Sequence, residues 1–364
     1  MRDRTVHPPL LLVGCSGSCA AVSREIQPEA RAYPDGIVAF PIRADGTLDV
    51  GMARVTGWEP TSYATYDEAR GRLFVLTQTN GDKPSAVGAF AVGDDGELTF
   101  INQQSTEGVE ACHLAVSPAG GHVASAHFSS ANYSVHPVDA RGALQPASHL
   151  LEVTGSGPHR RQNVPHPHMV QFAPDGDWAI TADMGTDEVA SHRLDLERGI
   201  LEGNQVPAAR VQPGGGARHF VLAGSRIFVC NELDSSVTVM RFDPATGHLA
   251  YRDHQTTLLD ASRSGEAHCG AIRLSPDGRF LYVANRGRGT VAVFKVEGDA
   301  LSPVGEASCP GEGARDMLVI DNAVYVAFAG GDRLSVFPRD AGTGEVGPLR
   351  QTLDLPAPMF VLAI

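Results

Sequence analysis

The sequence has few cysteines, few aromatic residues and no long apolar segment. Its six cysteines are scattered over 364 residues, and only Cys15 and Cys19 stand close together. This spacing fits neither a zinc ribbon nor a disulfide scaffold, so a reducing cytoplasm is the simplest compartment. No segment approaches the roughly 18 apolar residues that cross a membrane. We therefore expect a cytoplasmic protein without a membrane partner.

One short motif near the start qualifies this expectation. The residues LVGC at 12–15 resemble a bacterial lipoprotein cleavage site. However, the apolar run before this cysteine extends only from Leu10 to Val13, whereas a secretory segment needs roughly 7 to 15 apolar residues. We predict a buried first strand here.

Positive charge is also scarce. Lys and Arg number 29 against 42 Asp and Glu, which gives a net charge of −13. The long-range field of such a chain repels nucleic acid and anionic membrane surfaces. A small anionic substrate remains compatible, because a few converging arginines can reverse the potential locally.

Sequence patterns of helical period are scarce, whereas turn residues are abundant. The chain contains 40 Gly and 24 Pro, and hydrophobic residues make up 42 % of it. This composition is typical of a globular protein with a large core built from short strands. We therefore searched the sequence for a repeat.

Three signals each recur seven times. The first is a turn followed by the start of a strand, at ADGTLDV (44), DDGELTF (94), ARGALQP (140), ERGILEG (197), ATGHLAY (245), EGDALSP (297) and GTGEVGP (342). A strand of alternating type precedes each turn, at residues 36, 85, 133, 188, 236, 290 and 333. The third signal is an apolar strand, at residues 59, 110, 166, 216, 269, 313 and 356. A strand, a tight turn and a second strand form a hairpin.

The repeat predicts an all-β, seven-bladed β-propeller. The mean period is about 364/7, roughly 52 residues, which accommodates four short antiparallel strands per blade. The hairpin signal comes first at the N-terminus, and the last apolar strand has no hairpin after it. The N- and C-terminal strands should therefore complete one blade and close the ring. We expect residues 1–364 to form a single domain.

Alignment of the repeats places polar residues in two columns. The first column, just before the inner strand of each blade, holds Cys112, His168, Arg218, Gly270 and Arg315. The second holds His127, Asp183, Asn231 and Asn285, followed by Phe128, Met184, Glu232 and Arg286. Equivalent positions in successive blades point to one axis, so we expect these residues to meet at one mouth of the central channel.

Several motifs carry a resemblance to a known family. They are RQNVPHPH (161–168), ARH (217–219), NEL (231–233), SPDGRFLYVANRG (275–287) and ARD (314–316). With these motifs the chain resembles, from about Leu11 to Ile364, the seven-bladed lactonase family. That family includes propeller-type 6-phosphogluconolactonases and fungal 3-carboxy-cis,cis-muconate lactonizing enzymes. The resemblance implies a soluble, cofactor-free enzyme that opens or forms a lactone ring.

The resemblance also implies a set of site residues. The catalytic set would be His168 (or its neighbour His166), Arg218, Glu232 and Arg286. The two arginines offer forked donors for a carboxylate, a phosphate or an oxyanion. Either Glu232 or His168 could act as the general base. We expect the substrate-binding residues to include His166, His127, Asp183, His219, Arg315 and Gln78.

The sequence departs from the family pattern at several positions. Ala271 replaces an acidic residue, His127-Phe128 replaces Asn-Tyr, Thr77-Gln78 replaces Asn-Glu, and Phe328-Ala329 replaces Asn-Gln. We expect these positions to face the axial channel. The changes indicate an altered substrate and argue against 6-phosphogluconolactone itself.

These observations favour hydrolysis of a small anionic lactone without a metal. His166 and His168 alternate on one face as metal ligands would, but a zinc site needs three or four ligands of good geometry. Two alternatives remain open: a lactonizing cycloisomerase or related isomerase acting on an unsaturated dicarboxylate or a specialised metabolite, and a propeller that serves only as a binding scaffold. Glu232 and Arg286 could also form a purely structural ion pair.

Overall fold

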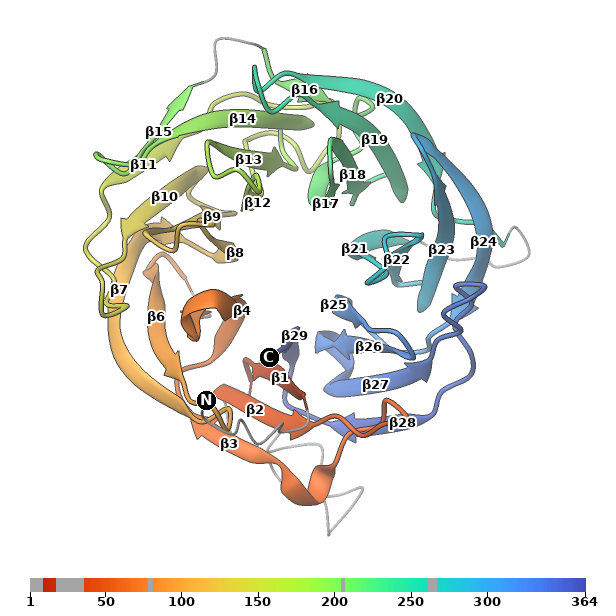
Figure 1. Cartoon of the computed structure of the whole chain (residues 1–364). Coiled ribbons are helices and arrows are strands. Elements are labelled where there is room, and N and C mark those ends of the chain that lie inside the picture. Colours follow the sequence, from red (N-terminus) through yellow and green to blue (C-terminus); the bar gives the residue numbers. More distant parts are fainter. Residues whose placement is uncertain (1–8, 18–35, 78–80, 204–206, 261–266) are drawn as a thin grey trace.

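The computed structural model describes residues 9–17, 36–77, 81–203, 207–260 and 267–364. Their strands form seven antiparallel sheets arranged as blades around a central axis (Figure 1). Helical structure within these ranges is confined to three short 3-10 turns, at Val50–Met52, Glu68–Arg70 and Ala329–Gly331. No helix in the described ranges has the length and apolar character needed to cross a membrane.

Each blade has four strands, and one carries a short fifth strand at its edge. From the innermost to the outermost strand, the blades are β29 (Pro358–Ala363), β1 (Leu10–Cys15), β2 (Gly36–Pro41) and β3 (Arg54–Gly57); β4 (Thr61–Asp67), β5 (Arg72–Thr77), β6 (Pro84–Val92) and β7 (Leu98–Val109); β8 (Ala111–Val116), β9 (His122–His127), β10 (Asn132–Pro137) and β11 (His149–Glu152); β12 (Pro167–Phe172), β13 (Trp178–Asp183), β14 (Glu188–Asp195) and β15 (Ile200–Gly203), with β16 (Ala209–Arg210); β17 (Ala217–Ala223), β18 (Arg226–Asn231), β19 (Ser236–Phe242) and β20 (Leu249–Thr256); β21 (His268–Leu274), β22 (Phe280–Arg286), β23 (Thr290–Glu297) and β24 (Ala300–Ser308); and β25 (Ala314–Val319), β26 (Ala323–Phe328), β27 (Arg333–Pro338) and β28 (Gln351–Asp354).

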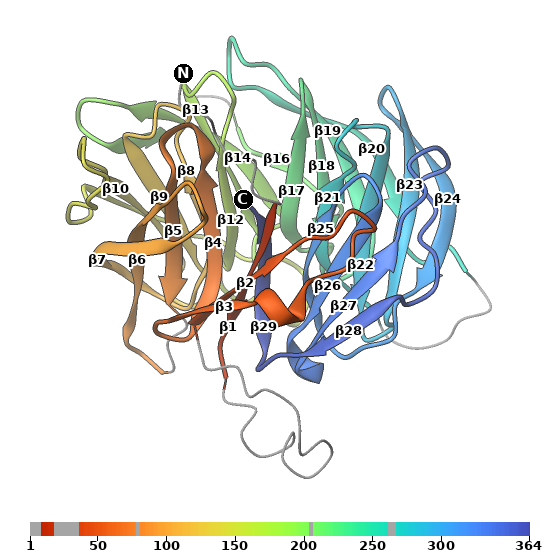
Figure 2. The ribbon, with the colours of Figure 1, turned by 60° about the horizontal axis from the view of Figure 1, so that its bottom comes forward.

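The seven-bladed fold and the predicted ring closure are confirmed. The innermost strand of the first blade is the C-terminal strand β29, which pairs with the N-terminal strand β1, for example at Leu12↔Leu362 and Val13↔Val361. Figure 2 shows these two strands side by side, with the other blades continuing on both sides of them. Removal of either strand would leave the ring open.

The repeated turns share one backbone feature in all seven blades. Its glycine has a positive φ at each of Gly46, Gly96, Gly142, Gly199, Gly247, Gly298 and Gly344. A residue with a Cβ is strained in this left-handed region, which explains why glycine recurs at this point of the repeat.

Burial follows from the stacking of blades. The second strand of a blade is covered on both faces by its neighbours, so all six residues of β13 and of β26 are buried. Such strands contain nearly continuous apolar runs instead of alternating ones. The innermost strands of the blades surround the central axis of the ring (Figure 1).

Candidate functional site

A β-bulge near the start of the inner strand recurs around the ring. In β8 the pairing register with β9 shifts between Ala111 and His113, which leaves Cys112 without a partner residue on the neighbouring strand. The same shift leaves His168 unpaired in β12, Arg218 in β17 and Arg315 in β25. A bulge locally re-aims a side chain. All four of these side chains line one central cavity of about 250 Å³.

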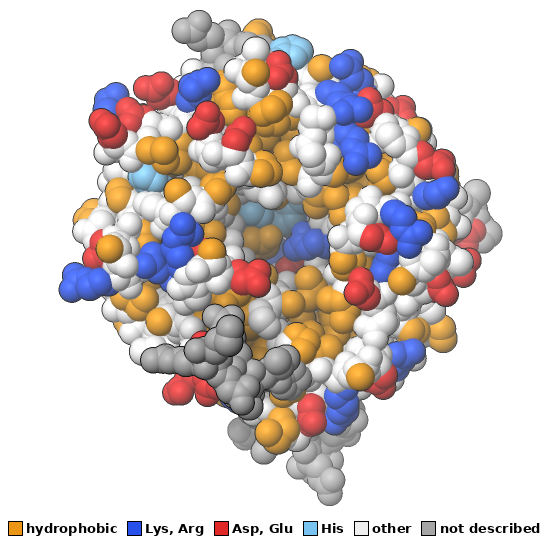
Figure 3. Space-filling model, viewed as in Figure 1, with side chains coloured by type: hydrophobic (Ala, Val, Ile, Leu, Met, Phe, Trp, Pro, Cys, Tyr) orange, Lys and Arg blue, Asp and Glu red, His pale blue; other side chains and the backbone are white. Residues whose placement is uncertain are grey.

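The second column of residues ends at the same cavity. Phe128 follows β9, Glu232 follows β18, and Arg286 is the last residue of β22. The complete lining is Glu110, Ala111, Cys112, Phe128, Arg161, His168, Arg218, Glu232, Arg286, Arg315 and Met359. Figure 3 shows a hollow at the centre of the ring, with histidine and basic side chains inside it. The four residues predicted to be catalytic are therefore brought together.

Glu232 is the centre of an ion-pair network. Its carboxylate is 3.0 Å from Nε of Arg218, 2.6 Å from Nη2 of Arg286 and 2.8 Å from Nη2 of Arg161. Burial acts to raise the pKa of Glu232, but the charges of Arg286 and Arg218 outweigh it and hold the pKa far below its usual range. Glu232 therefore stays ionised and holds three arginines in place, which makes it a poor proton acceptor.

The arginines around Glu232 differ in how they are held. Arg218 is buried, and its Nη1 also donates to the carbonyl oxygen of Gly270 at 2.6 Å. Arg286 donates from Nη2 to the carbonyl oxygen of Cys269, while its buried Nε has no partner among the residues described. This Nε is therefore a free donor beside the cavity.

Arg315 lines the same cavity without any ion pair or hydrogen bond to the described part of the chain. Burial, followed by the charge of Arg218, lowers the pKa of Arg315 to about 10, so the guanidinium remains charged at neutral pH. Arg315 is partly buried, and its charge, which has no partner in the described structure, is available to an anionic ligand in the cavity.

His168 is the other predicted base. Its ring is 5 % exposed, and its Nδ1 lies 3.7 Å from Sγ of Cys112. Burial, with the charge of Arg218 adding to it, lowers the pKa of His168 well below its ordinary value. The imidazole is therefore neutral at neutral pH and can accept a hydrogen bond. Burial also raises the pKa of the Cys112 thiol to about 12, which leaves this thiol inert.

Two of the predicted substrate-binding residues lie away from the cavity. His127 is fully buried inside its blade, where its ring nitrogens contact Ser125 at 3.0 Å and Asn132 at 2.8 Å. One carboxylate oxygen of Asp183 accepts hydrogen bonds from three backbone N–H groups, those of residues 166, 185 and 186. Neither residue lines the central cavity, so a role of either in binding substrate stays a prediction.

The remaining predicted residues lie around the cavity or outside the described ranges. His166 is stacked on the ring of Phe128, which lines the cavity, at a centroid distance of 4.2 Å. The ring of His219 lies 5.1 Å from that of His168, and its Nδ1 is 3.2 Å from Nη1 of Arg218. Gln78 lies outside the residues that the structure describes.

Of the residues that depart from the family pattern, some line the cavity and others do not. Phe128 lines the cavity. Ala271 and Phe328 instead belong to a hydrophobic cluster between two blades, so the prediction that they face the channel is wrong. Their side chains pack in this cluster and do not line the central cavity.

Two lining residues were missed in the sequence, Arg161 and Glu110. Arg161 reaches Glu232 from the loop before β12, which is anchored by its buried neighbour Gln162. The Nε2 of Gln162 donates to the carbonyl oxygen of Met184 at 2.7 Å and to Asp187 at 2.6 Å. The RQ pair at the start of the RQNVPHPH motif was a signal, but the contact spans 71 residues and depends on the fold.

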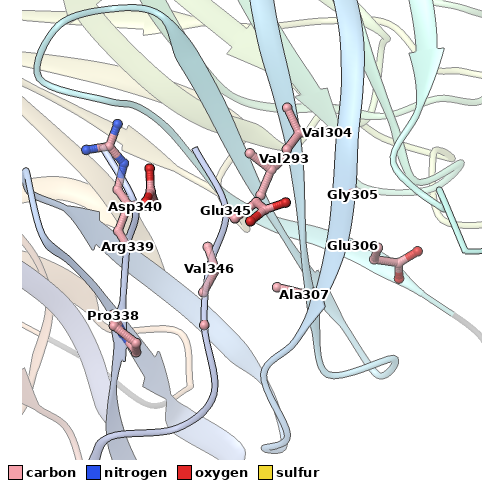
Figure 4. A pocket seen from close by; sticks show the side chains of 11 residues that line it. Val293, Val304, Gly305, Glu306, Ala307, Pro338, Arg339, Asp340, Glu345 and Val346 are labelled. Atoms are coloured by element: carbon pink, nitrogen blue, oxygen red, sulfur yellow. The ribbon is translucent and has the colours of Figure 1, made fainter. Parts of the chain in front are cut away.

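A larger cavity of about 530 Å³ lies at the outer part of the ring (Figure 4). Its walls come from β23, β24 and the segment 338–347 of the next blade. Its acidic lining residues are Glu306, Asp340 and Glu345, and its one arginine, Arg339, donates to the hydroxyl of Tyr282 at 2.6 Å. This cavity does not suit an anion, so the central cavity is the candidate site.

No group of three or more His, Cys, Asp or Glu side chains in the described ranges is arranged to hold a metal ion. The polar functional groups that line the central cavity are guanidinium, carboxylate, imidazole and the thiol of Cys112.

Comparison with known proteins gives consistent matches. The model of the family described as "Lactonase, 7-bladed beta-propeller" matches residues 30–363. The chain is 30 % identical over 310 residues to a protein from Bacillus subtilis named 6-phosphogluconolactonase, covering 83 % of this chain and 86 % of that protein. It is 27 % identical over 293 residues to a protein of Formosa agariphila named 6-phosphogluconolactonase, and the match covers 77 % of this chain and 82 % of that protein. The structure of a periplasmic gluconolactonase from Pseudomonas aeruginosa superimposes on this one with a TM-score of 0.86 at 26 % sequence identity. The superposition covers 98 % of this chain and 99 % of the other.

Proposed function

Because this chain belongs to the seven-bladed β-propeller lactonase family, we propose that it hydrolyses the ring ester of a small anionic lactone in the central cavity. One observation carries the proposal: four arginines line this cavity, and three of them share a single buried carboxylate. The site therefore has surplus positive charge, which suits an acidic substrate and the negative charge that develops on the acyl oxygen.

The arginines stabilise the transition state in this proposal. Addition of water to the acyl carbon places negative charge on the acyl oxygen. Arg286, with its free Nε, and Arg218 donate to that oxygen, and Glu232 fixes both guanidinium groups beforehand. Such preorganisation is effective because no donor has to be reoriented during the reaction.

His168 assists the attack of water. Since its imidazole is neutral, it accepts a hydrogen bond from the bound water and orients it towards the acyl carbon. Collapse of the tetrahedral intermediate breaks the bond to the ring oxygen, which leaves as a hydroxyl group, and the product is a hydroxy acid. The chemistry uses side chains alone and involves no metal or other cofactor.

The substitution Arg286→Ala tests this function. We expect kcat/KM for the best substrate in a lactone panel to fall by about 10²–10³-fold, the usual cost of losing an oxyanion donor. The circular dichroism spectrum should be unchanged, and the matched variant Arg279→Ala, which removes a surface arginine, should keep full activity. Full activity of the Arg286 variant, or a wild-type protein that opens no lactone but cyclises a muconate, would overturn the proposal.

We also propose a cytoplasmic location. Three cysteines, Cys112, Cys230 and Cys269, are free thiols and buried in the described structure, which suits a reducing compartment. A related structure is named as periplasmic, so the fold itself does not fix the compartment. Fractionation of the native host with an antibody tests the location, and recovery in an extracytoplasmic fraction would contradict it.

A further inference from the structure

One carboxylate that lines the central cavity has no role in the mechanism above. Glu110 is the single residue that connects β7, the outermost strand of one blade, to β8, the innermost strand of the next. Among the described residues it forms no ion pair with the cavity arginines, whereas Glu232 is paired with three of them. Its side chain is exposed, while that of Glu232 is buried. Glu110 is thus the acidic group of the cavity that faces solvent.

The backbone of Glu110 is held in an unfavourable conformation. Its φ is +55°, in the left-handed region where glycine would be unstrained. The N–H of Phe128 donates to its carbonyl oxygen at 3.1 Å, and the hydroxyl of Ser129 donates to its carboxylate. Strained residues held by their surroundings cluster at functional sites. Both the main chain and the side chain of Glu110 are therefore fixed at the edge of the cavity.

The hydrolysis proposed above needs a proton acceptor. Glu232 is saturated by arginines, and a protonated His168 would lie buried beside the positive charge of Arg218. Glu110 is an exposed carboxylate of the cavity and is open to solvent water, whereas Arg218 is buried. A carboxylate that is open to solvent and forms no ion pair with the cavity arginines can accept a proton from water.

We propose that Glu110 is the general base of this enzyme. Its carboxylate takes one proton from the attacking water as the water oxygen bonds to the acyl carbon. The same proton then passes to the ring oxygen as the bond between the acyl carbon and that oxygen breaks, so Glu110 is regenerated as a carboxylate. His168 orients the water. This assignment rests on the proposed lactone hydrolysis.

If Glu110 is the general base, kcat/KM depends on pH through its carboxylate and through the other charged groups of the cavity. The charged and titratable side chains that share the cavity with Glu110 are Cys112, Arg161, His168, Arg218, Glu232, Arg286 and Arg315. Because a general base must be ionised to act, kcat/KM of the wild-type protein should fall on the acid side of its pH profile. That acid-side fall should be absent from a variant in which an amide replaces the carboxylate.

The test compares Glu110→Gln with the matched control Glu107→Gln. Glu107 is also exposed and also has a positive φ, at +58°, but does not line the cavity. We expect Glu110→Gln to lower kcat by about 10²–10⁴-fold with little change in KM and to lose the acid-side fall. Glu107→Gln should retain wild-type kinetics. In Glu110→Gly, which suits the left-handed backbone, added formate should restore part of the lost rate.

The outcomes separate this assignment from the proposed function. If wild-type protein hydrolyses a lactone and Glu110→Gln keeps that activity, the role of Glu110 is overturned and the proposed function stands. If the rate falls but formate does not rescue Glu110→Gly and the acid-side fall persists in Glu110→Gln, Glu110 is structural. If wild-type protein opens no lactone, both fail together.

Discussion

At the scale of single residues, Arg315 differs from the other cavity arginines because it lacks a partner in the described structure. We expect Arg315→Ala to raise KM for lactones that carry a carboxylate or phosphate by about 10-fold or more, equivalent to roughly 1.4 kcal/mol of lost binding. KM for a neutral lactone should change little. The melting temperature should not fall, since no ion pair is lost.

Steady-state kinetics with one charged and one neutral lactone checks this prediction. Arg333→Ala removes an exposed arginine that does not line the cavity and serves as the control. An equal rise in KM for both lactones would contradict a specific role for Arg315 in binding the substrate's own charge.

Substitution of Glu232, unlike that of Arg315, should lower the stability of the protein. The substitution Glu232→Gln leaves Arg218, Arg286 and Arg161 close together without the carboxylate that joins them. Loss of one partner from a buried ion pair typically costs about 3–5 kcal/mol, so we expect the free energy of unfolding to fall by that order.

Urea denaturation at neutral pH measures this change. The control is Glu297→Gln, which breaks an exposed pair with Lys295 and should leave the urea midpoint nearly unchanged. A similarly small loss in Glu232→Gln would show that the network has little effect on stability and that the arginines tolerate one another.

At the scale of elements, the pairing of β1 with β29 closes the ring and depends on one glycine. A Cβ at Gly14 would lie 1.9 Å from the ring of Phe360 on β29. Gly14→Ala must therefore displace Phe360 or separate the two strands, and overpacking of this kind costs about 1–3 kcal/mol. Thermal unfolding should show a lower melting temperature.

Gly57 in the outer strand β3 provides the comparison. A Cβ there meets no atom within 4 Å, so Gly57→Ala should leave the melting temperature nearly unchanged. Equal stability of the two variants would mean that the closing pair of strands contributes little to the integrity of the ring.

At the scale of the whole molecule, the stacked blades bury many histidines in a neutral state. Burial lowers the pKa of His127 and His192 to about 4, and burial also lowers the pKa of His113, His168 and His219 well below the ordinary value. In the unfolded chain these groups bind protons below about pH 6.5. Their contribution to stability is therefore complete above that pH and decreases as the pH falls towards the lowered values in the folded state.

We expect the free energy of unfolding to fall between pH 6.5 and pH 5. The slope should be about 1.4 kcal/mol per pH unit for each histidine that remains neutral in the folded state. Urea unfolding midpoints at pH 7.5, 6.0 and 5.0 measure it. The exposed His248 serves as the control, since His248→Gln should leave the slope unchanged. Identical midpoints across this range would contradict the prediction.

The sequence by itself determined the architecture of the molecule. A turn glycine, an alternating strand and an apolar inner strand recur seven times. These signals can be recognised in the sequence because turn conformation and the periodicity of side chains depend on residues that are neighbours in the chain. The order of these signals also determined that β29 joins β1. Because equivalent positions of a repeat face one axis, the convergence of His168, Arg218, Glu232 and Arg286 could be predicted as well.

Only the tertiary structure decided what these residues contact. Glu232 meets Arg161 because a loop anchored by Gln162 folds back over the channel, 71 residues away in the chain. His127 stands at the end of its strand as Asn231 does, yet its ring is used inside the blade. Side-chain direction at a bulge, pairing of buried charges and the lack of a partner for Arg315 depend on packing between blades. These interactions join residues distant in sequence, so no local pattern encodes them.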